Sequence, residues 1–238
     1  MRGSRSRPMS RSIVAIAAGV MCVAALSAAG SASAQSRLEV TLSGARWEGY
    51  DLGQRRATIT GPQAPTGTPV TLFDSDVAIL PGPGAELRLG WRVFRGVYAE
   101  ATGGLGVNSI EARIHDDIEQ APALTVSSTL TQVTVEGGAL VELATLRLSA
   151  GHLVPFVDGG GGYLRQVHEN RVLIETGRTI YLGAGLKWRS SALHPRGVAQ
   201  RLMARGDVRF ISRTAGVDVD DARRHYLTVS GGVGIRLF

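Results

Sequence analysis

The chain has 238 residues, with 26 Lys and Arg against 20 Asp and Glu, a formal net charge of +6 and a single cysteine, Cys22. Four of the arginines lie in the first twelve residues, and without them the balance falls to 22 basic against 20 acidic residues, which is weak support for nucleic-acid binding. Cys22 also lies in this early segment, so the remainder has no thiol for a disulfide, a zinc site or a nucleophile.

Residues 1–34 have the three-part pattern of a secretory signal peptide. Basic residues without acids are followed by an apolar or small stretch over 13–29, and residues 32–34 fit a small-residue cleavage site. The apolar core is short for a membrane span, and no charged stop-transfer flank follows it. We therefore expect export by the general secretory route, removal of 1–34, and one domain over 35–238.

Alternation of apolar and polar residues, the two-residue period of a strand, continues along this domain. A first strand is predicted at 38–47. Residues 48–83 are rich in Gly, Pro, Thr and Asp and are predicted to be the longest irregular connection, in which two β-like pieces, 57–60 and 70–73, extend the flanking strands as a hairpin above the membrane. The clearest hairpin turns at Arg95–Gly96 and joins strands at 85–94 and 97–107.

Further strands are predicted at 125–143, 153–166, 178–188 and 206–213. The connections between them are at 111–123, 144–151, 167–177, 189–204 and 214–224. Shorter and longer connections alternate, as expected for a membrane barrel with short periplasmic turns and longer outer loops, although 189–204 is longer than that pattern predicts.

The last thirteen residues, Tyr226–Phe238, form the final predicted strand. Leu227, Val229, Val233 and Ile235 share an apolar face, while the other face is small or polar. A terminal strand is normally an exposed edge, but closure against the first strand removes that edge. We therefore predict an all-β fold, an eight-stranded antiparallel up-and-down transmembrane β-barrel with both ends on the periplasmic side.

Charged residues occupy alternate strand positions, which suits a barrel with lipid outside and polar groups inside. An eight-stranded interior is narrow enough for side chains to fill it, so we expect cross-strand ion pairs and glycines that make room for them. A gated ion path is the alternative. The predicted interior charges are Glu39, Glu86, Arg88, Arg92, Glu100, Glu136, Glu142, Asp158, Lys187, Asp207, Arg209 and Arg236.

Several segments together resemble the small outer-membrane β-barrels of the OmpA/OmpX type, in the wider outer-membrane beta-barrel domain family. They are the signal peptide and residues 96–107, 153–166, 179–188 and 226–238. The resemblance covers essentially the whole exported chain and implies location in the outer membrane of a Gram-negative-type bacterium. It also implies that Phe238 is the signal read by the barrel-assembly machinery, although the apolar register ends on Leu237, one step out of phase.

No segment carries a recognisable catalytic or metal-binding motif. Residues 159–165, GGGGYLR, lack the Gly-Lys-Ser/Thr ending of a phosphate loop and fit strand glycines better. The histidines His115, His152, His168, His194 and His225 have no regular spacing, which argues against a metal site. For a lipid-modifying enzyme the nearest candidates are His225 with Ser212, or His168 with loop serines.

Trp91, Trp188 and Tyr163 lie near strand ends on the apolar register and are predicted to form interfacial aromatics. Arginines in or beside the outer loops are predicted either to bridge lipopolysaccharide phosphates or to be solvated loop charges. These are Arg171, Arg178, Arg213, Arg223 and Arg224.

The sequence thus predicts a monomeric, non-enzymatic, structural or surface-interaction barrel of the cell envelope, without cofactor, metal or nucleic-acid partner. Its expected partners are outer-membrane lipid, lipopolysaccharide, the barrel-assembly machinery and a surface ligand bound through the loops. Three alternatives stay open: a narrow, porin-like channel for small or hydrophobic solutes, a lipid-modifying enzyme, and a secreted lipocalin-like barrel with the apolar register facing inward.

Overall fold

The computed structural model describes residues 38–59, 70–115, 122–146, 152–169, 173–190, 202–217 and 222–237, all within one compact unit, Ser36–Phe238. The predicted signal peptide and Phe238 lie outside these residues. No helix in the described part of the chain is long and apolar enough to cross a membrane, a finding that does not bear on spanning strands. One short 3-10 turn, η1, covers Ala144–Leu146.

The described residues form one antiparallel sheet of ten strands. They are β1 (Leu38–Trp47), β2 (Tyr50–Ile59), β3 (Val70–Leu80), β4 (Gly82–Phe94), β5 (Val97–His115), β6 (Leu124–Glu142), β7 (Leu153–His168), β8 (Ile174–Arg189), β9 (Leu202–Ala215) and β10 (Arg224–Leu237).

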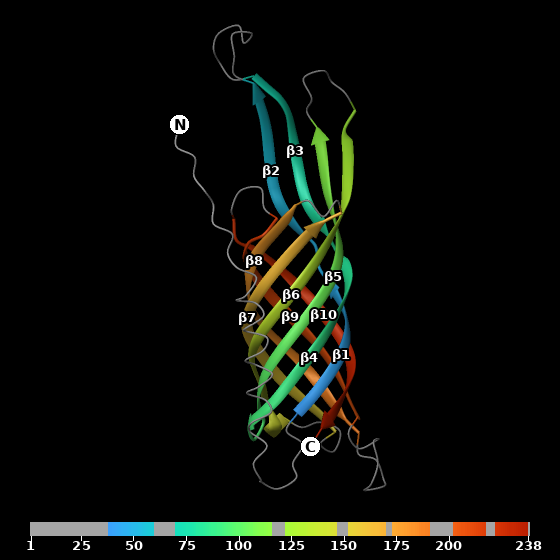
Figure 1. Ribbon diagram of the computed structural model, residues 1–238, viewed down its shortest axis with the longest axis vertical. Coiled ribbons are helices and arrows are strands. Elements are labelled where there is room, and N and C mark those ends of the chain that lie inside the picture. Colours follow the sequence, from blue (N-terminus) through green and yellow to red (C-terminus); the bar gives the residue numbers. More distant parts are fainter. Residues whose placement is uncertain are drawn as a thin grey trace. The chain divides into compact units, whose positions relative to one another are not determined.

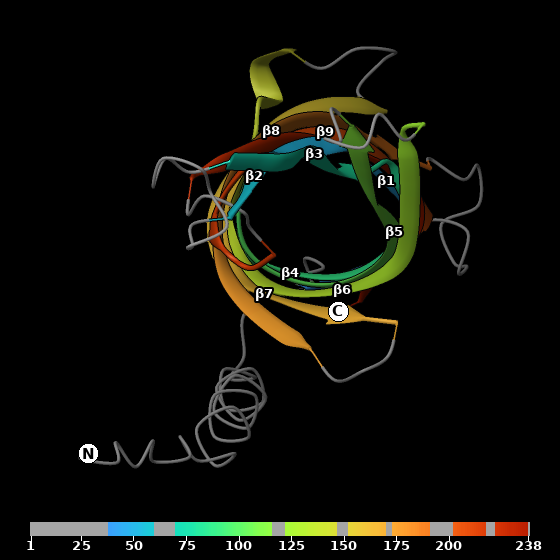
Figure 2. The same cartoon turned by 90° about the horizontal axis from the view of Figure 1, so that it is seen from above.

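Eight of these strands close into a ring (Figures 1 and 2). β1 pairs with β10 from Leu38↔Leu237 to Trp47↔Thr228, and on its other side with β4. From β4 to β10 each ring strand then pairs with the next along the chain. Closure leaves the terminal strand without an edge, which is the predicted arrangement.

β2 and β3 are the two strands beyond the predicted eight, and they form a hairpin attached to the ring. β2 follows β1 after only Glu48 and Gly49, and β3 precedes β4 with Pro81 between them. Proline has no N–H for the ladder and therefore interrupts a continuous strand at this point. Most of the segment 48–83, predicted to be irregular with two short β-like pieces, is thus strand.

Several other boundaries differ from the prediction. β5 continues to His115 and β6 begins at Leu124, so the predicted connection 111–123 is shorter than expected. β9 begins at Leu202 rather than at Gly206, which removes residues 202–204 from the predicted connector. β8 begins at Ile174, four residues before the predicted start. In each case the added residues pair with a neighbouring strand, and this pairing satisfies their backbone N–H and C=O groups.

The apolar face of each ring strand points outward and the polar face points inward. On β1, Leu42 is 62% exposed while Glu39, Thr41 and Ser43 are buried. On β4, Leu87 and Leu89 are exposed, whereas Arg88 is only 1% exposed. The lipocalin-like alternative required the apolar residues to face inward, and the structure places them outward.

Glycines on the inner face make room for charged side chains, as predicted, since a Cβ at Gly183 would lie 2.7 Å from Arg209 Cγ. They also make room for a large aromatic side chain. Trp47, at the upper end of β1, turns into the barrel and packs against β5. A Cβ at Gly106 would lie 2.9 Å from Trp47 Cε3, and one at Gly104 would lie 3.3 Å from Trp47 Cζ2. The indole could not occupy this position against any larger residue.

β2, β3 and the ends of β5 and β6 continue above the ring as a small sheet (Figure 1). We call it the extension, and define it as β2, β3, Ser109–His115 and Leu124–Thr129. At its base Leu52, Ile79, Leu130 and Val217 form a buried apolar cluster, against which Tyr50, Val77 and Ile110 pack.

Candidate functional site: the barrel interior

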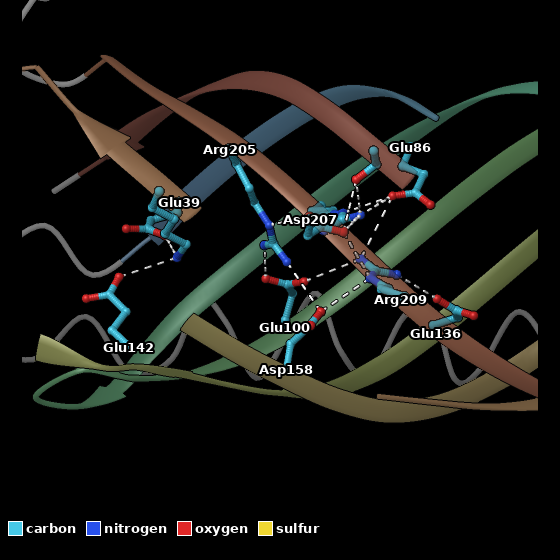
Figure 3. A network of polar contacts seen from close by, with 12 residues as sticks. Glu39, Glu86, Glu100, Glu136, Glu142, Asp158, Arg205, Asp207 and Arg209 are labelled. Atoms are coloured by element: carbon cyan, nitrogen blue, oxygen red, sulfur yellow. Dashed lines mark hydrogen bonds and ion pairs between the residues drawn. The ribbon is translucent and has the colours of Figure 1, made fainter. Parts of the chain in front are cut away.

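Ionic side chains fill the interior at two levels (Figure 3). The central cluster consists of Glu86, Arg88, Glu100, Glu136, Asp158, Arg205, Asp207 and Arg209, all of them buried. The lower cluster lies toward the end where β1 begins and β10 ends, and consists of Glu39, Glu142, Lys187 and the half-buried Arg189.

Asp207 contacts all three arginines in the central cluster, and the longest of these contacts is from Arg209 Nε to Asp207 Oδ1 at 3.5 Å. Arg88 Nη1 donates to Asp207 Oδ2 at 2.6 Å, and Arg205 Nε donates to the same oxygen at 3.0 Å. Arg88 also contacts Glu86 on its own strand, and Arg205 Nη1 lies 2.5 Å from Glu100 Oε2. The planar guanidinium suits this role because it presents several donors in a fixed geometry.

Arg209 connects the central cluster to the opposite wall. Its Nη1 lies 3.2 Å from Glu136 Oε2 on β6, and its Nε lies 3.3 Å from Asp158 Oδ2 on β7. The guanidinium also stacks over Tyr181, 4.8 Å from the ring centroid. Removing one partner from such a buried pair leaves an uncompensated charge, which typically destabilises a protein by about 3–5 kcal/mol.

Lys187 is the centre of the lower cluster. Its Nζ lies 2.6 Å from Glu39 Oε2 and 3.5 Å from Glu142 Oε1, and it sits 4.2 Å from the centroid of the Tyr98 ring. Arg189 contacts Glu142 as well. Cations and carboxylates therefore alternate across the lower interior, so the charges neutralise one another locally.

Above the central cluster, hydrogen bonds run from strand to strand along the inner wall in a ladder of neutral amides that ends at one arginine. Asn108 Nδ2 donates to Leu80 O at 2.8 Å, and Gln132 Nε2 donates to Asn108 Oδ1 at 2.8 Å. Gln166 Nε2 donates to Gln132 Oε1 at 2.9 Å, and Arg213 Nη1 donates to Gln166 Oε1 at 2.8 Å. We call these four side chains the upper ladder (Asn108, Gln132, Gln166 and Arg213).

The chain after β9 folds back into the mouth of the ring and ends the upper ladder. Val217 N donates to Gln166 Oε1 at 2.8 Å, Arg213 contacts Val217 O, and the Val217 side chain joins the apolar cluster below the extension. Positive φ angles at Ala215 (61°) and Gly216 (97°) produce the sharp change of direction. Apolar, amide and ionic side chains thus succeed one another from the mouth inward.

The structure brings most of the predicted interior residues into these two clusters. Those that form ion pairs there are Glu39, Glu86, Arg88, Glu100, Glu136, Glu142, Asp158, Lys187, Asp207 and Arg209. Arg92 and Arg236 are half-buried and lie within electrostatic reach of Tyr98. The predicted interfacial aromatics Trp188 and Tyr163 are exposed on the outer face, and Trp91 is partly exposed there.

Sequence reasoning missed several interior residues. Arg189 was placed at the start of the predicted connector 189–204, and Arg205 fell between that connector and the strand predicted at 206–213. Asn108 lay just beyond the strand predicted at 97–107. Trp47 and Gln166 lie on strands that were predicted, but neither was assigned to the interior. The alternation itself could have identified Arg205, because Met203, Arg205 and Asp207 continue the inward register backward.

Arg213 is a correction to the predicted set of rim arginines. Its side chain is 1% exposed and points into the barrel, so it cannot meet lipopolysaccharide. Arg178 and Arg223 are exposed, whereas Arg224 is half-buried and donates to Leu52 O. Arg171 lies outside the described residues.

The structure also places the other candidate residues. Residues 159–165 are part of β7, and no group of three or more metal-ligating side chains forms in the described part of the chain. His115 Nε2 contacts Asp76 Oδ2 at 3.0 Å. His225 lies opposite Ser212 in the β9–β10 pairing, but its ring stacks on Phe210 with a centroid distance of 5.4 Å.

Solved structures with similar folds include several outer-membrane β-barrel proteins. OprG of Pseudomonas aeruginosa matches with a TM-score of 0.50 at 8% identity, over 85% of this chain and 96% of OprG. The fold is that of a small outer-membrane β-barrel. Neisserial surface protein A (TM-score 0.46, 11% identity, 84% of this chain and 97% of that one) and Ail of Yersinia pestis (0.40, 10%, 84% and 99%) are also similar.

No protein-family model matches the sequence, and no curated protein matches it either. At these identities the structural likeness concerns the fold alone. The resemblance to the OmpA/OmpX type in particular therefore stays a prediction.

Proposed function

We propose that this chain is an integral outer-membrane β-barrel of structural or surface-interaction type, non-enzymatic, with an interior filled by its own polar side chains. The observation that carries the proposal is the polarity of the closed ring. Large apolar side chains are exposed on every ring strand, while charged and amide groups are buried inside. Only an apolar solvent around the barrel makes that arrangement favourable.

The ends of the outer apolar band support a membrane position. Trp91 and Trp188 lie on the outer face toward the lower end, and Tyr163 closes the apolar run of β7 toward the upper end. Aromatic side chains prefer the headgroup level, where an apolar ring and a polar atom are both satisfied. With the start of β1 and the end of β10 on the periplasmic side, the extension and the connections β5–β6, β7–β8 and β9–β10 lie on the side that faces the cell exterior.

The interior supports a filled barrel rather than an open conduit. The upper ladder, the central cluster and the lower cluster succeed one another along the barrel. The amides of the ladder join side chains of neighbouring strands, and ion pairs in the two clusters join strands that are not neighbours. Planar-bilayer recordings test this part of the proposal: the folded barrel is expected to carry no steady current. A stable open conductance would favour the narrow-channel alternative.

The partners follow from this placement. Outer-membrane lipid and lipopolysaccharide surround the ring, and the extension and outer connections are available to a surface ligand. The barrel-assembly machinery reads the C-terminal residue Phe238. Expression that leaves the masses of lipid A and phospholipids unchanged agrees with a non-enzymatic role. A new lipid species that depends on His225 and Ser212 would contradict it.

The decisive experiment is heat-modifiable gel mobility of residues 35–238 folded in detergent, together with envelope fractionation. We expect a compact species to shift on boiling and the protein to pellet with the outer membrane. A chain that remains soluble and folded without detergent would contradict membrane insertion, since the outer apolar band would then be covered by another partner.

A further inference from the structure

Two arginines stand side by side on the outer face of the barrel, at the upper end of the apolar band. Arg165 on β7 and Arg178 on β8 are both exposed and point outward, because their neighbours Gln166 and Thr179 are buried inside. On β7 the apolar run ends at Tyr163, two residues before Arg165. β8 runs in the opposite direction, and its apolar run ends at Ile180, so Arg178 is the next outward-facing residue toward the upper end.

The strand register sets the distance between the two guanidiniums. Arg178 lies directly opposite Tyr163, and Arg165 lies directly opposite Thr176. The arginines are therefore diagonal neighbours across the β7–β8 ladder, with backbones about 7–8 Å apart. Arginine side chains are long enough to converge on one small anion from that spacing.

Neither arginine has a carboxylate among its paired neighbours. Arg165 pairs with Val133 and Thr176, while Arg178 pairs with Tyr163 and Thr214. None of the ion pairs in the described part of the chain involves Arg165 or Arg178, although the outward-facing Arg46 and Arg56 each have an acidic partner. The two charges are thus uncompensated on a face whose lower part contacts lipid.

From these positions we infer that Arg165 and Arg178 form a binding site for the phosphate group of an outer-leaflet lipid. Each guanidinium donates to phosphate oxygens, the Thr176 and Thr214 hydroxyls lie beside them on the same face, and the Tyr163 ring lies against the upper part of the acyl chains. This inference rests on the proposed membrane position and assigns a partner to one sector of the outer rim.

The position on the barrel favours a lipid headgroup over a free anion. An arginine pair immediately beyond an apolar run is at headgroup level, where phosphates are concentrated. A phosphate held there also remains attached to acyl chains that pack below it on Tyr163 and Ile180. The site therefore gains apolar contact that inorganic phosphate cannot supply.

The test measures lipid retention by native mass spectrometry on residues 35–238 folded in neutral detergent and titrated with lipid A. The wild-type barrel is expected to retain lipid A, and Arg165→Gln with Arg178→Gln is expected to weaken retention about tenfold or more. Arg55→Gln with Arg113→Gln removes two arginines from the extension and is expected to retain lipid A as the wild type does. Heat-modifiable mobility of each variant establishes that it is folded.

Three outcomes would overturn the inference. The variant Arg165→Gln with Arg178→Gln could retain lipid A fully, or the extension control could lose lipid A as much as that variant does. Inorganic phosphate at equal concentration could also displace lipid A, which would indicate a free-anion site. Failure of the wild-type chain to show heat-modifiable mobility is a different result, because it would contradict the proposed membrane barrel itself. A single Arg178→Lys variant, which keeps the charge but not the fork, is expected to retain lipid at an intermediate level.

Discussion

Strands β5 and β6 run through both the ring and the extension, and their polarity reverses between the two. Within the ring, β5 turns Glu100, Thr102 and Asn108 inward, while Leu105 and Val107 are exposed outside. From Ile110 onward the two faces of β5 exchange their residue types. Ile110 packs on the inner apolar cluster, and the alternation places Glu111 and Arg113 outside. The alternation of side chains continues without a break, so only the residue types change.

β6 changes at the corresponding level. Gln132 and Glu136 face inward and Val133 faces outward in the ring, whereas above it Leu130 is buried inside and Ser127 is exposed on the outer face. This reversal of polarity indicates the level at which the surroundings change from an apolar medium to water. Below this level an apolar medium favours apolar groups outside. At the base of the extension, where water surrounds the sheet, the apolar groups gather inside, although Leu124 and Val126, farther along the inner register of β6, are exposed.

Breaking an interior ion pair is expected to have the largest effect. Arg209→Met leaves Glu136 and Asp158 buried without their main counter-charge, so the free energy of unfolding should fall by about 3–5 kcal/mol. Urea unfolding in detergent, followed by tryptophan fluorescence, measures it. Arg113→Met on the outer face of the extension is the control and should change stability by about 0.5 kcal/mol or less. A loss of unfolding free energy in Arg209→Met as small as that in Arg113→Met would mean that Arg209 is not structurally important.

Placing a charge on the outer face tests the solvent boundary directly. Leu42→Arg lies between Leu87 and Val233 in the apolar band and is expected to cost about 2–4 kcal/mol in lipid. Ser127→Arg also points outward, but in the extension and opposite Glu111, so it should be tolerated within about 0.5 kcal/mol. Unfolding in lipid vesicles measures both. A large cost for Ser127→Arg would place the extension inside the membrane.

Truncating apolar side chains should distinguish a protein core from a lipid contact. Val217→Ala removes two methyl groups from the closed cluster below the extension and should cost about 1–2 kcal/mol. Val208→Ala removes the same atoms from the lipid-facing side of β9, where surrounding acyl chains can fill the space, and should cost less than half as much. Thermal unfolding in the same vesicles compares them. Equal costs would argue that the Val208 side is also packed against protein.

The smallest expected effect is at the outer face of the extension. Arg56 Nε and Nη2 donate to the two oxygens of Asp74 at 2.9 and 3.1 Å, and this hydrogen-bonded pair lowers the pKa of Asp74. Because the folded pKa is depressed, the stabilisation is present above the ordinary Asp pKa of about 3.9 and is lost as the pH falls below it.

The pair is exposed, so the effect on global stability should be slight. Carboxyl-carbon NMR should nevertheless show Asp74 titrating below the ordinary range, and Arg56→Gln should return its midpoint to that range. Hydrogen exchange in the ring strands should not change with this titration. A change there would show that the extension and the ring unfold together.

Much of the architecture could be predicted because alternation is a local property. The inward position of Glu86, Arg88 and Glu100 follows from their spacing on strands that one hairpin joins, and the outward position of Leu87 follows with it. The extension was largely missed for the opposite reason: Tyr50–Ile59 and Asp74–Asp76 are polar, and their strand conformation comes from pairing with each other and with β5 rather than from their own propensity.

The sequence by itself determined which side of each ring strand faces inward, because successive side chains on a strand must point to opposite faces and a one-residue shift would bury the wrong set. It also determined that the interior would be charged. Only the tertiary structure decided which charges meet. Arg88 binds Asp207 from 119 positions away, and Lys187 binds Glu39 from 148 positions away, because closure of the ring, not sequence proximity, brings opposite walls within hydrogen-bonding distance.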